Sequence, residues 1–352
     1  MTKKVTMQQI ADHLGVSKYV VSKALSGKGG VSEATKERVI GVASQLGYFA
    51  QNSGYVKAGK TGHEDGRLPE TGVRQSVLVL MPNIRFQTRD SVYWGRILDG
   101  IASRLEEKEI GSVIVMEQKV EGFLQLLKPE GLLGMIGVGE IASSMLLEIH
   151  RLGIPMVLVD HEDMLIPTDT VYANNYDCMY RLTKHLIGIG HRSIGFIGNI
   201  RYSRSFFERW NGFRHAMEEF ELWDGHDHLT DLEAMEHFDE PIKAWLTRRK
   251  KQRLLPTALV CANDSIAIDA HRAAKELGME APGDFSLTGF DNIEDAARHY
   301  PPITTVNVPK EWLGIRAVDK LLERIERPEE PLEKLMILGD LVYRQSIQGI
   351  KP

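Results

Sequence analysis

Polar side chains follow several of the short apolar runs in this 352-residue chain, at points where a buried strand would end. They are Asn83, Arg85, Asp160, Asn263 with Asp264, and Asp291 with Asn292. Carboxylates and amides brought together could hydrogen-bond a polyhydroxylated or amine-bearing small molecule, and paired acids also carry out glycosidase chemistry. Each of these residues could instead cap the next helix, a role that suits Asn263 before Asp264-Ser-Ile-Ala.

The elements that must position these groups alternate between apolar runs and amphipathic stretches. Strands are expected at 76–81, 112–116, 134–138, 155–159, 193–197, 258–261 and 285–288, and helices near 93–108, 142–152, 175–189, 206–221, 239–251 and 264–277. This alternation is typical of right-handed βαβ units on parallel sheets, and its length suits two such sheets. Ligands of open α/β sheets bind outside the carboxyl ends of the strands, so the polar residues there are the first candidates for a site.

The first 60 residues differ in charge from the remainder of the chain. They contain nine Lys and Arg against three Asp and Glu, a net charge of +6, whereas the whole chain carries −5, so residues 61–352 carry −11. A basic head on an acidic body indicates a polyanionic partner for the head, unless the difference is a chance fluctuation.

Three short helices are predicted in the first 46 residues, and the first two are joined by Leu14-Gly15-Val16. Two helices joined in this way form a helix-turn-helix, whose second helix would lie in the DNA major groove. The outward residues of that helix are Lys18, Tyr19, Ser22 and Lys23. Lysine can donate to guanine, and tyrosine offers both a hydroxyl and a ring face. The alternative is a three-helix bundle that simply needs a glycine turn and solvated lysines.

Four segments of the head carry a family resemblance: Val5-Thr-Met-Gln-Gln-Ile-Ala-Asp-His-Leu-Gly-Val-Ser17, Val21-Ser-Lys-Ala-Leu25, Val31-Ser-Glu-Ala-Thr-Lys-Glu-Arg-Val39 and Leu46-Gly-Tyr48. Together they resemble the DNA-binding head of the LacI/GalR family of transcriptional regulators. The resemblance implies that Lys18, Tyr19 and Lys23 occupy the positions that read bases.

The resemblance continues through the body in four further motifs: Arg209-Trp-Asn-Gly-Phe213, Ala262-Asn-Asp-Ser-Ile-Ala267, Gly289-Phe-Asp-Asn292 and Pro301-Pro-Ile-Thr-Thr-Val306. It implies two periplasmic-binding-protein-like subdomains with a small-molecule effector between them. By matching position, the expected effector contacts are Asp160, Arg209, Asn263 and Asp291. Asn83 and Arg85, which follow the first strand, are further candidates. The first cleft loop, with Arg85 and Trp94, varies within the family, and Trp94 could instead pack the first helix of the body.

The hinge at the end of the head departs from the family pattern. Gly54 stands where the family has alanine, and Lys57 stands where it has the leucine that wedges into the minor groove. Glycine costs about 1 kcal/mol in a helix interior relative to alanine, and lysine is not an apolar wedge. We therefore expect Lys57 to contact a phosphate, Tyr55 or Val56 to replace the wedge, and the operator to bend less than is usual for the family.

The composition argues against a cysteine-based metal or disulfide site and against a membrane protein. Neither Cys178 nor Cys261 belongs to a CxxC pair, and no apolar run reaches the roughly 18 residues of a membrane span. The N-terminus lacks the apolar stretch of a signal peptide, so we expect a cytoplasmic protein without a membrane partner. The His-rich segment 224–228, with His237, is interpreted as a solvated loop rather than a metal site. We predict no catalytic residue, cofactor or metal.

These observations predict an N-terminal all-α helix-turn-helix head (residues 1–60), a flexible Gly-rich linker (61–75) and an α/β effector-binding and dimerisation domain (76–352) of two doubly wound parallel-sheet subdomains. The expected function is a sequence-specific DNA-binding transcriptional regulator, a repressor that acts as a homodimer on double-stranded operator DNA under the control of a sugar-like effector. The alternative is a cytoplasmic sugar-binding or sugar-modifying protein. The sequence leaves open the effector, the sign of its action, the operator, and dimer versus tetramer.

Overall fold

The computed structural model describes residues 7–25, 35, 39, 76–82, 91–118, 122–123, 131–225, 228–232 and 238–350. Most of the predicted third head helix, the hinge with Gly54 and Lys57, the linker 61–75, and Asn83 and Arg85 lie outside these residues.

The head contains the predicted pair of short helices, α1 (Met7–Leu14) and α2 (Lys18–Leu25). Gly15 lies between them with φ +65°, a left-handed conformation that favours glycine. The hydroxyl of Ser17 accepts a hydrogen bond from the Val20 N–H (3.3 Å) at the start of α2. Ile10 and Val21 are fully buried, so the two helices pack through their apolar faces. The helix-turn-helix geometry predicted from the sequence is confirmed.

The first subdomain is built on a six-stranded parallel sheet. Its strands run in the order β10 (Lys334–Ile337), β5 (Asp169–Ala173), β4 (Met156–Val159), β3 (Leu132–Val138), β1 (Ser76–Leu80) and β2 (Gly111–Val115). Along β1, Val77 and Val79 belong to one hydrophobic core, while Leu78 and Leu80 belong to the other. Because both faces of the sheet are covered, its central strands are continuously apolar.

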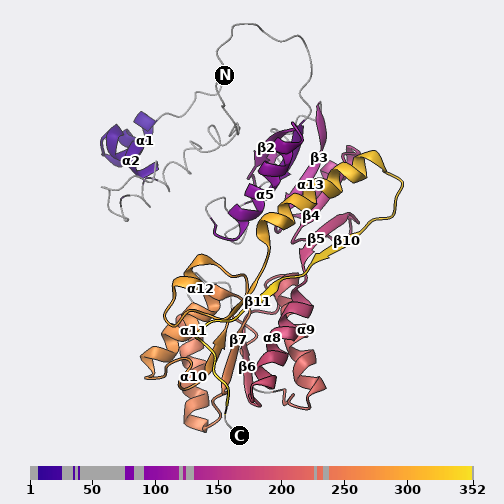
Figure 1. Ribbon diagram of the computed structural model, residues 1–352. Coiled ribbons are helices and arrows are strands. Elements are labelled where there is room, and N and C mark those ends of the chain that lie inside the picture. The colour runs from indigo at the N-terminus through magenta and orange to yellow at the C-terminus, as the bar shows by residue number, and fades with distance from the viewer. Residues whose placement is uncertain are drawn as a thin grey trace.

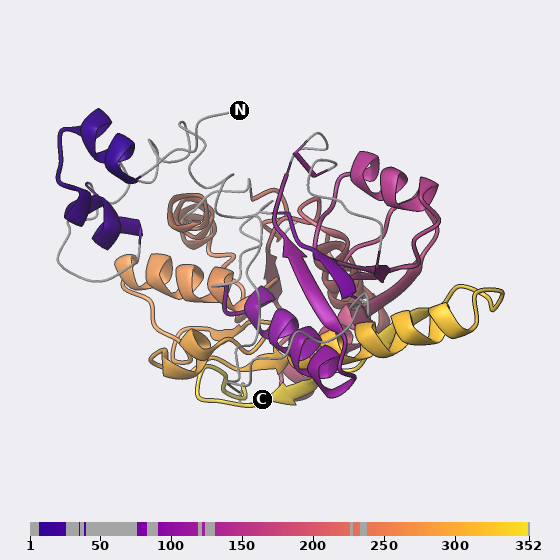
Figure 2. The ribbon, with the colours of Figure 1, turned by 90° about the horizontal axis from the view of Figure 1, so that it is seen from above.

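The helices of the described ranges that cover this sheet are α5 (Trp94–Glu107), α7 (Ser143–Arg151) and α13 (Lys310–Glu326). Buried residues of α7 belong to one core, and those of α5 and α13 belong to the other. The last two helices lie against each other, and their backbones approach closely at Gly100 and Gly314 (Figures 1 and 2). A Cβ atom on Gly100 would lie 2.0 Å from the Glu311 carbonyl oxygen, so this contact requires glycine.

The described residues of the second subdomain form a three-stranded parallel sheet and five helices. The strands are β6 (Ile194–Ile197), β7 (Ala258–Cys261) and β8 (Ser286–Thr288), in that order across the sheet. The helices are α8 (Asn175–Gly188), α9 (Arg204–Glu219), α10 (Asp239–Gln252), α11 (Asp264–Glu276) and α12 (Glu294–Arg298). An antiparallel pair, β9 (Thr305–Asn307) with β11 (Asp340–Val342), accompanies this sheet.

The chain passes between the subdomains after β5, between β9 and α13, and between β10 and β11. The yellow C-terminal segments α13 and β10 therefore lie among the elements of the first subdomain, while the C-terminus lies in the second (Figure 1). The two parallel-sheet subdomains were predicted from the sequence, whereas β5, β9, β10, β11, α12 and α13 were not. No helix in the described ranges is both long and apolar enough to cross a membrane.

Candidate functional site

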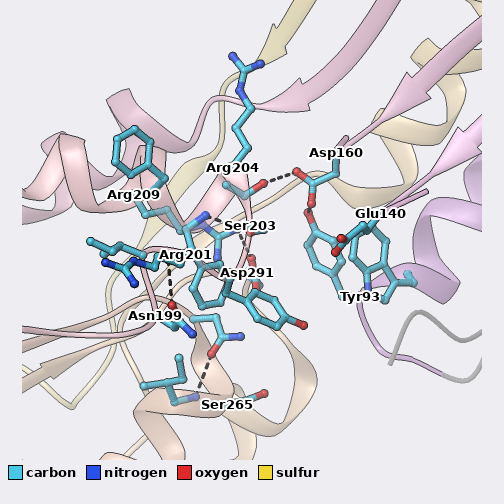
Figure 3. Close-up of a pocket in the computed structure, with 18 of the residues that line it drawn as sticks. Tyr93, Glu140, Asp160, Asn199, Arg201, Ser203, Arg204, Arg209, Ser265 and Asp291 are labelled. Atoms are coloured by element: carbon cyan, nitrogen blue, oxygen red, sulfur yellow. Dashed lines mark hydrogen bonds and ion pairs between the residues drawn. The ribbon is translucent and has the colours of Figure 1, made fainter. Parts of the chain in front are cut away.

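A cleft of about 750 Å³ lies between the two subdomains, at the carboxyl ends of their parallel strands. The first subdomain contributes the start of α5 and the residues after β3 and β4, and the second contributes the residues after β6, β7 and β8. Figure 3 shows Tyr93 and Asp160 on one wall and Arg209 and Asp291 on the other. The cleft therefore lies where the sequence analysis expected it, outside the carboxyl ends of the parallel strands.

Arg209 lies at the centre of the wall formed by the second subdomain, with only 2% of its surface exposed. Its guanidinium donates to the side chain of Asn175 (2.8 Å), to the Ala262 carbonyl (2.8 Å) and to the carboxylate of Asp291 (3.0 Å). It also lies over the Phe290 ring, 3.9 Å from the ring centre. The guanidinium of Arg209, predicted to contact an effector, therefore forms hydrogen bonds with the protein itself, and it holds Asp291 in place in the cleft.

Asp160 faces this pair from the first subdomain, just beyond β4. The Ser205 hydroxyl donates to one carboxylate oxygen (2.5 Å), and the Tyr93 hydroxyl donates to the other (3.4 Å). Burial raises the pKa of Asp160 to about 6, although the Ser205 hydrogen bond and the charge of Arg209 oppose this shift. Since Asp160 comes from the first subdomain and Ser205 from the second, the hydrogen bond between them joins the two walls.

The backbone is strained where the cleft acids lie. Asp160, Asp291 and Asn292 adopt φ values of +53°, +106° and +53°, which side-chain-bearing residues rarely adopt. The segment 289–293 is held by the fully buried Asp264, which accepts from the Ile293 N–H (2.8 Å) and the Thr305 hydroxyl (2.6 Å). Such rigid support is typical of a binding site.

Asn263 has both of the roles considered for it. Its side chain accepts from the Ile266 N–H (2.9 Å) and so caps α11, and the residue also lines the cleft. Trp94 lines the cleft as well and packs edge-on against Tyr93, with ring centres 4.9 Å apart. The positions of Asn83 and Arg85 lie outside the described residues.

Several lining residues were missed by the sequence analysis. Asn199 follows β6, so it is a polar residue at a strand end like the other candidates, but it was not included among them. Tyr93 and Phe238 precede helices rather than follow strands, and nothing in their local sequence distinguishes them. Aromatic rings beside acids and amides suit a ligand that has both hydroxyl groups and an apolar face.

The part of the chain that the structure describes contains no group of three or more His, Cys, Asp or Glu side chains arranged to hold a metal. His228, from the His-rich segment, stacks on Trp223 with ring centres 4.8 Å apart and accepts from the Phe196 N–H (3.2 Å). Burial lowers its pKa to about 4. This histidine is therefore half-buried against aromatic rings, which corrects the interpretation of the segment as a solvated loop at this residue.

A second candidate surface lies on α2. Lys18 and Tyr19 are exposed, Tyr19 to 68%, and the Lys23 ammonium lies 5.3 Å from the centre of the Tyr19 ring. Ser22 lies on the same helix, but its side chain, like all of Lys57, is outside the described residues. Exposed cations and an aromatic ring on the second helix of a helix-turn-helix suit contact with base edges and phosphates.

Two parts of the chain match known protein families. Residues 6–51 match the family described as bacterial regulatory proteins, lacI family, and residues 183–347 match a periplasmic binding protein-like domain. The ribose operon repressor of Haemophilus influenzae is 28% identical over 359 residues, an alignment that covers 98% of this chain and 99% of that protein.

Solved structures show the same fold. The transcriptional regulator CelR in complex with cellobiose superposes with a TM-score of 0.67 at 22% identity, over 97% of this chain and 99% of that one. The lac repressor dimer bound to operator and the anti-inducer ONPF superposes with a TM-score of 0.64 at 22% identity, over 99% and 100% of the two chains.

Proposed function

The chain belongs to the lacI family of bacterial regulatory proteins, whose members regulate transcription rather than catalyse reactions, and we propose that it represses its target genes as a homodimer under the control of a carbohydrate effector. One observation carries this proposal: the same chain contains a helix-turn-helix with exposed Lys18 and Tyr19 and a cleft whose acids, Asp160 and Asp291, adopt strained backbone conformations. The head is assigned to residues 1–60, the linker to 61–75 and the effector domain to 76–352.

The base-reading residues in this proposal are Lys18, Tyr19, Ser22 and Lys23, and Lys57 contacts the phosphate backbone. A two-fold dimer presents two such helices, so the operator is expected to be pseudo-palindromic. The lac repressor structure was solved as a dimer on its operator, which supports the same assembly for this chain.

The effector proposed for the cleft is a sugar or a related metabolite. Asp160, Arg209, Asn263 and Asp291 line the cavity together with aromatic rings, a combination that can bind hydroxyl groups and the apolar face of a sugar ring. CelR was solved with cellobiose, and one relative is a ribose operon repressor, which supports a carbohydrate. Asn83 and Arg85 remain proposed contacts from the first cleft loop.

A gel-shift experiment tests the DNA-binding function. Full-length protein is incubated with its own upstream region and with random duplex of equal length, at 50 and 200 mM salt. We expect preferential binding to the upstream region, with an affinity that falls on the order of 1,000-fold or more between the two salt concentrations if six or more phosphates are contacted. Equal binding to both duplexes would contradict the proposal.

The raised pKa of Asp160 gives effector binding a defined pH dependence. A ligand hydroxyl that donates to this carboxylate favours its ionised form and lowers its pKa in the complex, so binding releases a proton. Because the pKa of free Asp160 is about 6, affinity should fall by up to about tenfold for each pH unit below 6 and become constant above about 7.

Calorimetric titration between pH 5 and 8 tests this prediction, with whichever sugar of a panel containing D-ribose and cellobiose gives the largest thermal shift. The Asp160→Asn variant serves as the control, because its amide does not titrate. Its affinity is expected to be lower and independent of pH between 5 and 7. An unaltered pH profile in this variant would assign the proton to another group.

A further inference from the structure

The C-terminal end of α10 carries an unusual concentration of positive charge. Five of the six residues from Arg248 to Arg253 are Lys or Arg, although residues 61–352 as a whole carry −11. Arg249 is buried, while the other four are exposed. We refer to these four residues, Arg248, Lys250, Lys251 and Arg253, as the α10 basic end.

Within the described part of the chain, no carboxylate forms an ion pair with any residue of the α10 basic end. Two of the carboxylates at and after the end of α11 are engaged with other lysines, Glu276 with Lys243 and Glu280 with Lys275 (3.6 Å). Lys250 donates to the Leu277 carbonyl (2.7 Å), an interaction that leaves its charge uncompensated. Four exposed residues with positive charges and no carboxylate partner among the described residues therefore lie together on an acidic body.

Stabilisation of the helix dipole does not account for this cluster. A helix C-terminus is equivalent to only about half a negative charge, and one or two cations offset it. The neighbouring helix α9 is longer, with 16 residues, and ends without any basic residue in its last turn. A helix of this subdomain can therefore end without a basic residue in its last turn, and the α10 basic end exceeds what its own helix requires.

The position of α10 places this charge far from the effector cleft. Phe238, at the beginning of the helix, lines the cleft, and 14 helical residues extend about 21 Å from it. Figure 1 shows α10 in the second subdomain, at the end of the molecule away from the sheet of the first. The four charges thus form a separate surface and do not contribute to effector binding.

The shape of the α10 basic end suits an extended anion. Successive helical side chains diverge by about 100°, and Arg253 takes a left-handed conformation with φ +59°, so the four side chains spread around the helix end rather than converge on one point. A DNA duplex carries one negative charge for about every 1.7 Å of its axis, and its phosphates can be bound without base recognition. DNA is also the polyanion to which the head brings this protein.

We propose that the α10 basic end is a second, sequence-independent DNA contact, which holds the phosphate backbone of a duplex segment other than the one bound by the heads. The proposal rests on the DNA-binding function but not on the identity of the effector. A dimer would carry two such ends and could join its operator to a distant segment of the same chromosome.

A two-duplex capture experiment with the full chain tests this proposal. Protein is first bound to an immobilised duplex that contains the specific site, unbound protein is washed away, and a labelled random duplex is added. We expect capture of the second duplex at 50 mM salt and a loss on the order of 100-fold at 200 mM, the dependence calculated for about four phosphate contacts.

The matched variants are Lys250→Gln/Lys251→Gln/Arg253→Gln and, as a control with the same change in net charge, Arg214→Gln/Arg298→Gln/Arg327→Gln. The control residues are exposed but form ion pairs. The first variant should bind the immobilised site normally and capture at least tenfold less random duplex, whereas the control should capture as much as the native protein.

Equal capture by the two variants, or no capture by the native protein once it is bound to its site, would overturn the proposal. A native tetramer that dissociates to dimers only in the α10 variant would also overturn it and would assign this surface to the acidic body of another copy. Failure of the first step, binding to the immobilised site, would instead count against the regulatory function itself.

Discussion

Replacement of Asp291 by alanine is expected to destabilise the effector domain by about 3–5 kcal/mol and to abolish its response to a sugar. The alanine variant leaves the guanidinium of Arg209 buried without its carboxylate partner, 3.0 Å away in the native protein. Breaking a buried ion pair on one side is costly because the remaining charge is neither solvated nor neutralised. Chemical denaturation followed by circular dichroism measures the loss.

A double variant separates the cost of the isolated charge from the role of the residues in binding. Arg209→Gln/Asp291→Asn removes both charges, keeps a donor near Asn175 and the Ala262 carbonyl, and places at residue 291 a side chain that tolerates a positive φ. We expect this variant to lose clearly less stability than the alanine variant but to show a much smaller thermal shift than the native protein with any sugar that shifts the native protein. An alanine variant as stable as the native protein would show that the pair is not buried as described.

Replacement of Lys18 by alanine is expected to weaken binding to the operator by about 1–3 kcal/mol, or roughly 5- to 150-fold, with a much smaller effect on random duplex. Lys18 is exposed at the start of α2, so its removal leaves the packing of the head intact. The loss is specific because a side chain that contacts a base edge distinguishes sequences. Fluorescence anisotropy with both duplexes measures the two affinities.

Lys57→Ala is the matched comparison for Lys18→Ala. If Lys57 contacts only a phosphate, its loss should weaken binding to operator and to random duplex by the same factor and reduce the salt slope by about one. An equal effect of Lys18→Ala on the two duplexes would remove this residue from the base-reading set.

The structure suggests how the state of the cleft is transmitted to the chain crossovers. Lys310, buried at the start of α13, donates to the backbone carbonyls of Asp291 (2.5 Å) and Val308 (3.2 Å). It therefore ties a cleft acid to the segment that joins β9 to α13. A ligand that contacts Asp291 more favourably in one arrangement of the subdomains would shift the population toward that arrangement, and only such unequal affinity can couple the cleft to the head.

The sequence was sufficient to predict several of the buried strands, the glycine turn and the asparagine helix cap, because each depends on neighbouring residues only. The strands β1, β3, β4, β6 and β7 are apolar runs between polar segments, and their positions agree with the prediction to within two residues. The turn at Gly15 and the cap at Asn263 were also recognisable, because each depends on one residue type at one place. The position of the cleft followed from strand polarity alone.

The remaining features depend on contacts between distant parts of the chain. β10 pairs with β5 only because the chain returns to the first subdomain after β9. The strand is four residues long, Lys334–Ile337, and its side chains alternate between exposed and half-buried, so its sequence does not indicate this partner. Arg209 could be placed by family resemblance, but its engagement by Asn175 and Ala262 requires three elements to meet. Tyr93 lies against Asp160 for the same reason.

The most direct test measures the affinity of the full-length protein for its operator duplex, with and without saturating amounts of the sugar that gives the largest thermal shift, in the native protein and in Asp160→Asn. The account predicts a change of about 5- to 150-fold in the native protein, in either direction, and a much smaller change in the variant. A sugar that binds and stabilises the native protein while its operator affinity stays the same would contradict control of the head by the cleft.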